Sequence, residues 1–174
     1  MEAAPPPLAV NAWMIGTVLE QFGAQEIKER FLAPTANLDI WWSQGFSEPE
    51  AGSDLASLRT TAVRDGDAFV VNGQKTWTTL GQYGDWIFML VRTDPDVKKQ
   101  LGISMLLIDM TLPGVEVRPI ELIDGGYEVN EVWFTDVRVP ANLLVGELNQ
   151  GWTIAQVLFG DERGGAALGA GRGG

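Results

Sequence analysis

Two short polar segments hold most of the side chains in this sequence that could bind a ligand. The first, residues 43–54, combines hydroxyls, carboxylates, glycines and a proline directly after an apolar stretch. A loop of this composition offers hydroxyl groups and free backbone N–H groups, which can hold an anionic or polar ligand at the end of a strand. The same composition also suits an ordinary structural turn, so the residues by themselves leave both interpretations open.

The second segment, residues 72–79, places an indole among hydroxyl groups. Its Asn72-Gly73 pair predicts a tight hairpin turn that leads into a strand. On that strand, Trp77 and the neighbouring threonines would suit a flat heterocycle with polar edges, because the indole can pack on a ring face while a hydroxyl bonds to an edge. The alternative is that Trp77 packs in the core beside residues that favour strands.

The composition removes several kinds of active site. The sequence has no cysteine and no histidine, so it predicts no disulfide, no thiolate nucleophile, no histidine triad and no Cys/His zinc site. No metal site of another kind is expected either. Any acid–base chemistry must therefore come from carboxylates, lysine, tyrosine or a bound cofactor.

The charge pattern excludes a further class of partner. The chain has 12 basic and 23 acidic residues, a formal charge of −11, and its basic residues are scattered. Nucleic-acid binding needs a basic stripe, so none is expected. No apolar run approaches the roughly 18 residues of a membrane span, and residues 1–7 lack the features of a signal peptide. These patterns predict a soluble, cytoplasmic protein.

Helical patterns are confined to the two ends of the chain. Residues 1–36 are predicted to form helices, and Pro34 is expected to stop the second of them, which begins at Gln25. Residues 150–174 are again predicted to be helical before the pattern dissolves among glycines. The helical spacing near the N-terminus is carried by Val10, Trp13, Met14, Val18 and Phe22.

Residues 38–145 are predicted to form one strand after another. Asp65-Gly66 favours a tight turn, as Asn72-Gly73 does, and prolines punctuate the apolar runs. A series of strands without helical periodicity between them is typical of an antiparallel sandwich or barrel. The predicted fold is therefore α+β, with an antiparallel β-sandwich or barrel as the middle domain and helical fragments on both sides.

The two polar segments, taken together, resemble the signature of the acyl-CoA dehydrogenase family of flavoenzymes. The resemblance extends over residues 10–163, and the further motifs follow in the family's order. Those motifs are Gln21 to Leu32, Trp86 to Thr93, Gly102 to Asp109, Pro113 to Val115, Asn130 to Pro140 and Leu144 to Trp152.

The resemblance implies an architecture and an activity. Family members have an N-terminal helical domain, a middle β-domain and a C-terminal four-helix domain. They bind FAD between the β-domain, the C-terminal helices and a neighbouring subunit, remove an α-proton and a β-hydride from an acyl-CoA thioester, and usually pass the electrons to an electron-transferring flavoprotein. The intact protein is accordingly expected to be a homo-oligomer, a tetramer or a dimer.

The resemblance also divides this chain. Residues 1–37 correspond to the end of the helical N-terminal domain, residues 38–148 to the flavin- and acyl-CoA-binding middle domain, and residues 149–174 to the first helix of a truncated C-terminal domain. The chain is less than half as long as a typical member and resembles a fragment. We expect the fragment alone to be inactive.

Five residues match positions that bind ligands in the family. Phe46 and Ser47 match the loop that touches the flavin ring, and Ser53 matches a position near the flavin pyrophosphate and the CoA arm. Trp77 and Thr79 match the pair that flanks the flavin, with Thr79 near N5, where a hydrogen-bond donor stabilises the charge that develops as hydride arrives.

Two positions depart from the commonest family pattern. Glu50 stands where glycine is usual and could narrow the loop or repel the CoA phosphates, and Tyr127 stands where histidine is frequent.

The family's general base is a glutamate in one of two places. One place aligns with Glu162, and the other lies in a part of the C-terminal domain that this chain does not contain.

Two other functions remain as alternatives. One is a flavin-dependent oxidase or monooxygenase of the same fold, and the other is a non-catalytic β-domain that binds acyl-CoA or a protein partner.

Overall fold

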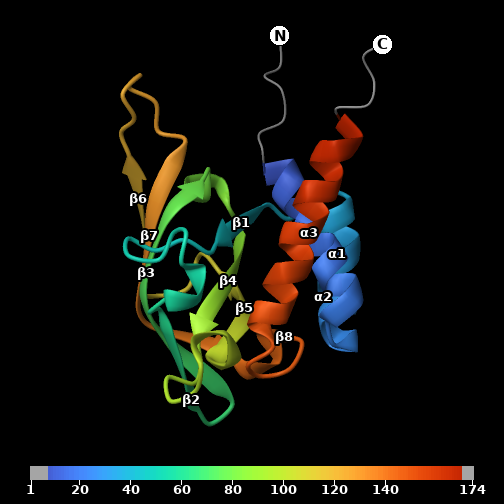
Figure 1. The fold of residues 1–174 in the computed structure, drawn as a ribbon, viewed down its shortest axis with the longest axis vertical. Helices are drawn as coiled ribbons and strands as arrows, with labels where there is room; N and C mark the ends of the chain where they lie inside the picture. The colour runs from blue at the N-terminus through green and yellow to red at the C-terminus, as the bar shows by residue number, and fades with distance from the viewer. Residues whose placement is uncertain (1–7, 170–174) are drawn as a thin grey trace.

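The computed structural model describes the backbone of residues 8–169 and the side chains of residues 10–160. The helical patterns expected for residues 1–7 and 170–174 lie outside this range. Three helices, α1 (Leu8–Phe22), α2 (Gln25–Ala36) and α3 (Gly151–Gly169), pack on one side of an eight-stranded sheet (Figure 1). The α+β class is therefore confirmed, whereas the domain boundaries at residues 37/38 and 148/149 stay a prediction.

The strands form a sheet in the order β6-β7-β3-β2-β4-β5-β8, with β1 paired to β4 off this path. Most neighbours are antiparallel, as expected, but β4 pairs in parallel with β1 and, at one residue pair, with β2. The bounds are β1 (Trp42–Gly45), β2 (Thr61–Asp65), β3 (Ala68–Thr79), β4 (Trp86–Arg92), β5 (Ile103–Asp109), β6 (Val115–Ile120), β7 (Val129–Pro140) and β8 (Leu144–Val145).

The two glycine turns predicted from the sequence have different outcomes. Gly66 has a φ of 61° in the tight turn that joins β2 to β3, so the first prediction is confirmed. The prediction of a turn at Asn72-Gly73 is wrong, because both residues lie inside β3. Gly73 is needed there for a close approach, since a Cβ on it would lie 2.4 Å from Oγ1 of Thr60.

The central strands β4 and β5 are buried along almost their whole length. Residues 87–91 and 103–108 are fully enclosed, which explains why both segments are continuous apolar runs rather than alternating ones. Helix α2 covers this layer through Phe31, whose ring lies edge-on to Trp42 at 5.5 Å and to Trp86 at 4.9 Å between centroids.

Two details of the predicted helices are wrong. Pro34 does not stop α2 but lies inside its last turn, because the helix continues to Ala36. On α1, Trp13 is 82% exposed, although its spacing grouped it with the core positions. Val18, one of the positions that carry the helical spacing, is buried, and Ile15 and Leu19 join it in the buried face of α1, which packs against the same core as the sheet.

Helix α3 packs directly against the sheet at its first residue, Gly151. A Cβ on Gly151 would lie 2.6 Å from the backbone carbon of Ser104 in β5, so the helix approaches the strand as closely as glycine allows. Along α3, Ile154, Ala155 and Leu158 are buried against the core. Among the described residues, none of the helices is long and apolar enough to cross a membrane.

We predict opposite effects from the same substitution at two positions of α3. Gly151→Ala should lower the unfolding free energy by about 1–3 kcal/mol, because the added methyl overpacks the contact with Ser104. Gly160→Ala should instead raise it by up to about 1 kcal/mol, because a Cβ there meets nothing within 4 Å and alanine favours helix. Urea unfolding of both variants tests this, and equal effects would contradict it.

Candidate functional site

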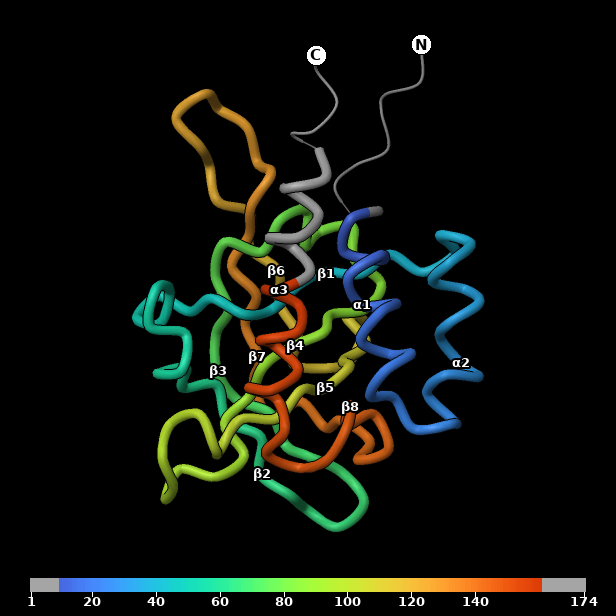
Figure 2. Tube along the Cα trace, turned by 45° about the vertical axis from the view of Figure 1, so that its right-hand side comes forward, coloured from blue at the N-terminus to red at the C-terminus, as the bar shows by residue number. Residues whose placement is uncertain are grey.

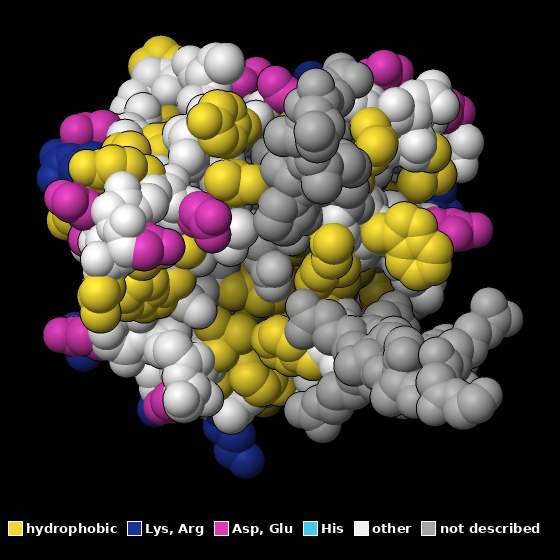
Figure 3. All heavy atoms as spheres, turned by 90° about the horizontal axis from the view of Figure 1, so that it is seen from above, with side chains coloured by type: hydrophobic (Ala, Val, Ile, Leu, Met, Phe, Trp, Pro, Cys, Tyr) yellow, Lys and Arg dark blue, Asp and Glu magenta, His cyan; other side chains and the backbone are white. Residues whose placement is uncertain are grey.

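A pocket of about 160 Å³ opens where β1 and β3 end beside α1. It brings together four residues that the sequence analysis singled out from two separate segments. Hydrophobic side chains gather in a hollow at the end of the molecule where β3 ends, as Figure 3 shows from above. The pocket is lined by Asn11, Gln44, Phe46, Ser47, Thr76, Trp77 and Thr79.

The loop after β1 is attached to β3 at this pocket. The backbone N–H of Thr76 donates to the carbonyl oxygen of Ser47 (2.9 Å). The ring of Phe46 is buried and lies edge-on to Phe88 of β4 and Phe159 of α3, at 5.8 and 6.0 Å between centroids. Phe46 therefore anchors the loop in the core while Ser47 stays partly exposed at the pocket.

A bulge in β3 sets the direction of Trp77. The register of β3 against β7 shifts between Lys75 and Thr78, and Trp77 within this shift has a φ of 59°. This left-handed backbone is unfavourable for a bulky side chain. The indole is 60% exposed, so the alternative of a core tryptophan is wrong. Trp77 and Thr79 both line the pocket, and Thr78 between them is buried.

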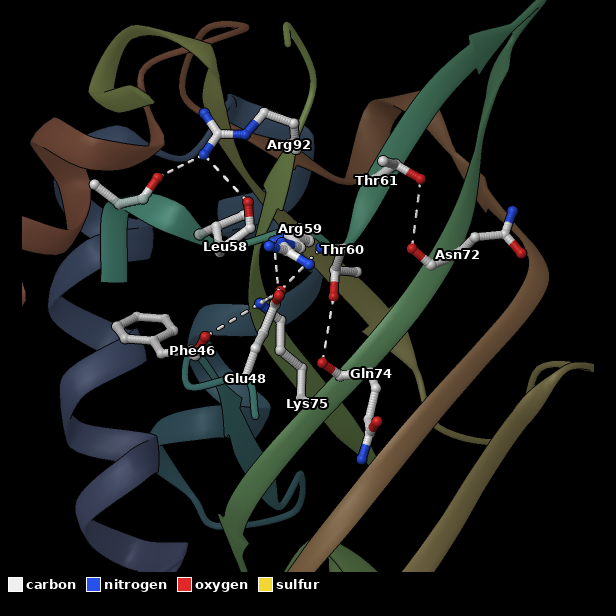
Figure 4. A network of polar contacts seen from close by, with 11 residues as sticks. Phe46, Glu48, Leu58, Arg59, Thr60, Thr61, Asn72, Gln74, Lys75 and Arg92 are labelled. Carbon is white, nitrogen blue, oxygen red and sulfur yellow. Dashed lines mark hydrogen bonds and ion pairs between the residues drawn. The ribbon is translucent and has the colours of Figure 1, made fainter. Parts of the chain in front are cut away.

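A buried ion pair, Lys75–Glu48, contacts the pocket residue Phe46, and the sequence analysis did not identify it. The ammonium of Lys75 is fully buried and donates to Oε1 of Glu48 (2.8 Å) and to the carbonyl oxygen of Phe46 (3.1 Å), as Figure 4 shows. Lys75 stands among polar residues, between Gln74 and Thr76, so nothing in its neighbourhood in the sequence indicates that it is buried, and its partner stands 27 residues away.

Glu48 extends this pair into a network. Its Oε2 accepts the N–H of Arg59 (2.6 Å) and its Oε1 accepts the N–H of Thr60 (3.0 Å), just before β2 begins. One carboxylate thus joins the loop, β3 and the approach to β2 (Figure 4). Burial raises the pKa of Glu48, but the Lys75 ammonium and these hydrogen bonds outweigh it and hold this pKa below its ordinary value. Burial lowers the pKa of Lys75 from 10.5 to about 8, although Glu48 opposes the shift.

Arg92, at the end of β4, holds the next part of the same loop. Its guanidinium donates to the carbonyl oxygens of Ala56 (2.6 Å) and Leu58 (3.2 Å), which fixes the short 3₁₀ turn η1 (Leu55–Ser57). Ser53 is exposed just before this turn and is not among the residues that line the pocket in the described part of the chain. The structure therefore does not bring Ser53 together with the other four predicted residues.

The remaining positions from the sequence analysis have distinct surroundings. Glu50 forms an exposed ion pair with Arg59 (2.6 Å), so its charge already has a cationic neighbour. Tyr127 is half exposed, and its carbonyl oxygen accepts a hydrogen bond from Gln82. Glu162 lies in α3, but its side chain is outside the described range.

Comparison with known proteins agrees with this arrangement. Residues 43–137 match the family described as "Acyl-CoA dehydrogenase, middle domain". The chain belongs to the acyl-CoA dehydrogenase family. It is 45% identical over 156 residues to the acyl-CoA dehydrogenase IpdE1 of Mycobacterium tuberculosis. The aligned region covers 90% of this chain and 40% of that protein.

Two solved structures have the same fold as this chain. The Tcur3481-Tcur3483 steroid ACAD superposes with a TM-score of 0.85 at 37% identity, covering 90% of this chain and 40% of that one. The ChsE4-ChsE5 complex from Mycobacterium tuberculosis gives a TM-score of 0.82 at 43% identity, covering 91% and 40%. The chain thus spans about two fifths of the length of these relatives.

The pocket has the chemistry that a flavin ring requires of its surroundings. An exposed indole offers a flat apolar face, and the hydroxyls of Ser47, Thr76 and Thr79 with the amides of Asn11 and Gln44 offer donors and acceptors for polar edges. The residues present therefore fit the flavin part of FAD.

We predict that breaking the Lys75–Glu48 pair on one side destabilises the protein more than removing both charges. Glu48→Gln should lower the unfolding free energy by about 3–5 kcal/mol, because it leaves a buried ammonium without its counter-charge. The double variant Glu48→Gln/Lys75→Met should recover much of this loss. Asp65→Asn, which breaks an exposed pair with Arg138, is the control and should change stability little. A double variant no more stable than Glu48→Gln would contradict the prediction.

The low pKa of Lys75 predicts a pH dependence of stability. Between pH 8 and about 10.5 the folded protein has released the Lys75 proton while the unfolded chain still holds it, so the unfolding free energy should rise with pH across this window. Lys75→Met should lack this rise. Urea unfolding at several pH values measures both proteins, and parallel profiles would contradict the assignment.

Proposed function

We propose that this chain is the flavin-binding portion of an FAD-dependent acyl-CoA dehydrogenase that desaturates the α,β bond of an acyl-CoA thioester. The observation that carries the proposal is that one pocket collects Phe46, Ser47, Trp77 and Thr79 from segments 30 residues apart in the chain. FAD, when bound, supplies the acceptor for the β-hydride. The family, the fold and the fit of the pocket support this function.

Each pocket residue has a role that its position supports. Trp77 packs its exposed indole on one face of the flavin ring, and the hydroxyls of Ser47 and Thr79 bond to ring edges. Phe46 and the ion pair below it hold the loop against β3, which excludes water from that side. The hydrogen bond that Thr79 donates would become stronger as negative charge develops on the ring.

We also propose Glu162 as a candidate for the general base that takes the α-proton. Phe159 of helix α3 contacts the pocket residue Phe46, and Glu162 follows Phe159 three residues later, about one helical turn along. A carboxylate in a water-poor site has a raised pKa and is a better base. A glutamate outside this chain is the other candidate.

The substrate and partners follow from the family. We propose a CoA thioester as substrate, with Ser53 and the loop around it toward the CoA arm, and an electron-transferring flavoprotein as electron acceptor. The intact protein would be a homo-oligomer, a tetramer or dimer, in the cytoplasm. The loop carries the ion pairs Glu50–Arg59 and Asp54–Lys99, so it presents both signs of charge to a ligand.

Anaerobic mixing of the intact protein with acyl-CoA thioesters tests the function. Bound FAD should lose its visible absorbance as the thioester is desaturated, and the electrons should then pass to an electron-transferring flavoprotein. Bleaching that requires no thioester, or turnover that requires O₂, would favour the oxidase or monooxygenase. Absence of a flavin spectrum would favour a non-catalytic binding domain.

We predict different effects for the two β3 residues in the intact protein. Thr79→Val should slow flavin reduction by about 1–3 kcal/mol in the barrier while FAD affinity changes less, because the lost donor matters most as charge develops. Trp77→Ala should mainly weaken FAD binding. Stopped-flow reduction and fluorescence titration of FAD separate the two, and an unchanged reduction rate in Thr79→Val would remove Thr79 from the site.

Glu162→Gln tests the position of the base. If Glu162 is the base, the variant should still bind substrate while flavin bleaching slows by about 10²–10⁴-fold, which is the usual contribution of a general base. Bleaching at the wild-type rate would assign the base to a glutamate outside this chain.

A further inference from the structure

Asn130 of β7 is buried directly behind the pocket and uses both of its amide hydrogens. Its side chain is fully enclosed. Nδ2 donates to the carbonyl oxygen of Thr78 (3.1 Å) and to Oε1 of Gln82 (2.5 Å). Neither acceptor lines the pocket, so Asn130 acts behind the residues proposed to touch the ligand.

The first of these bonds meets β3 at its bulge. Asn130 pairs with Thr78 in the ladder between β3 and β7, at the first regular position after the register shift. Thr78 stands between the two pocket residues of this strand, Trp77 and Thr79. A hydrogen bond that fixes the carbonyl group of Thr78 therefore also fixes the backbone that orients the side chains of Trp77 and Thr79.

The second bond ties the same point to the following turn. Gln82, in the 3₁₀ turn η2 (Gly81–Tyr83), also donates to the carbonyl oxygen of Tyr127 (2.9 Å). Leu80, just before the turn, has a left-handed φ of 49° and donates its N–H to the carbonyl oxygen of Glu128 (2.7 Å). These hydrogen bonds place Asn130 where the bulge, the turn and the base of the loop between β6 and β7 meet. Figure 2 shows this loop projecting from the rest of the molecule.

The surrounding space leaves little freedom to rearrange. A Cβ on Gly81 would lie 3.1 Å from Cγ2 of Thr78 and 3.5 Å from Nδ2 of Asn130. Two residues within four positions, Trp77 and Leu80, have backbone conformations that are unfavourable for L side chains. Such conformations persist only where neighbouring contacts hold them.

We propose that Asn130 is a positioning residue of the pocket. Through the carbonyl of Thr78 and the side chain of Gln82, it holds the bulge that turns Trp77 and Thr79 toward one ligand. The consequence for flavin binding rests on the proposed function, whereas the effect on the bulge belongs to the protein itself.

Asparagine is required here because both hydrogen bonds need a donor. Aspartate has the same shape, but the oxygen that replaces Nδ2 would face the carbonyl of Thr78 and Oε1 of Gln82, which are acceptors. Asn130→Asp therefore removes both bonds without changing the volume of the side chain. A protonated carboxyl regains one donor, so lower pH should partly restore the wild-type behaviour of this variant.

Amide hydrogen exchange of the flavin-free protein is the primary test. Exchange in the peptide 76–82 should be about tenfold faster or more in Asn130→Asp than in the wild type, in keeping with the loss of buried hydrogen bonds. Asn72→Asp is the matched control. It makes the same change on the same strand pair, at the other register shift, where Asn72 exchanges hydrogen bonds with Asp136. The control should leave exchange in 76–82 unchanged.

The second readout is the affinity of the full-length protein for FAD. Asn130→Asp should raise the Kd about tenfold or more at pH 8 and less at pH 5.5, and Asn72→Asp should change it little at either pH. Unaltered exchange in 76–82, or an unaltered Kd beside faster exchange, would overturn the inference. Wild-type protein that binds no FAD would overturn the proposed function instead, and the exchange rates would still decide whether Asn130 holds the bulge.

Gln82→Met provides the test if Asn130→Asp does not fold. Gln82 is only partly buried, and this change removes one acceptor of Asn130 and the bond to Tyr127. Exchange in 76–82 should then be about threefold faster and the Kd for FAD higher. An unchanged exchange rate or an unchanged Kd in Gln82→Met would overturn the inference.

Discussion

The ion pair between Lys75 and Glu48 is the constraint on which the pocket depends. Both groups are buried, and the ammonium also bonds the carbonyl of Phe46 while the carboxylate bonds the backbone ahead of β2. A buried charge that loses its partner is costly, so the loop after β1 and strand β3 keep one relative position. Phe46, whose carbonyl oxygen the ammonium bonds, and Thr76, next to Lys75 in β3, both line the pocket.

Two of the five described non-glycine residues with a positive φ angle lie close together at the end of β3. Trp77 stands in the second of the two register shifts of this strand, and Leu80 follows directly after the strand. The bulge shifts the register of β3 and so interrupts the regular alternation of its side chains. Trp77 lies within this shift, and its indole is at the surface. In a member of the acyl-CoA dehydrogenase family, this arrangement is consistent with a ring face prepared for a flat cofactor.

The helices support the pocket as well as the core. Helix α1 lines it through Asn11, whose amide donates to the carbonyl of Trp42, and Phe159 of α3 packs against the pocket residue Phe46. The pocket and its support therefore include both flanking helices, although the family match itself spans only residues 43–137. A β-domain separated from its flanking helices would lack both of these contacts.

The sequence by itself determined the α+β class and the succession of helical and strand regions, because local periodicity is written in neighbouring residues. Its resemblance to the acyl-CoA dehydrogenase family also singled out Phe46, Ser47, Trp77 and Thr79, which line one pocket in the structure. Tertiary structure decided the parallel pairing of β1 with β4, the buried face of α1, the place of Asn72-Gly73 inside β3, and the partnership of Lys75 with Glu48. Each of these features depends on which distant segments of the chain come into contact. Burial, close approach and charge pairing contribute to stability only when those segments are packed together.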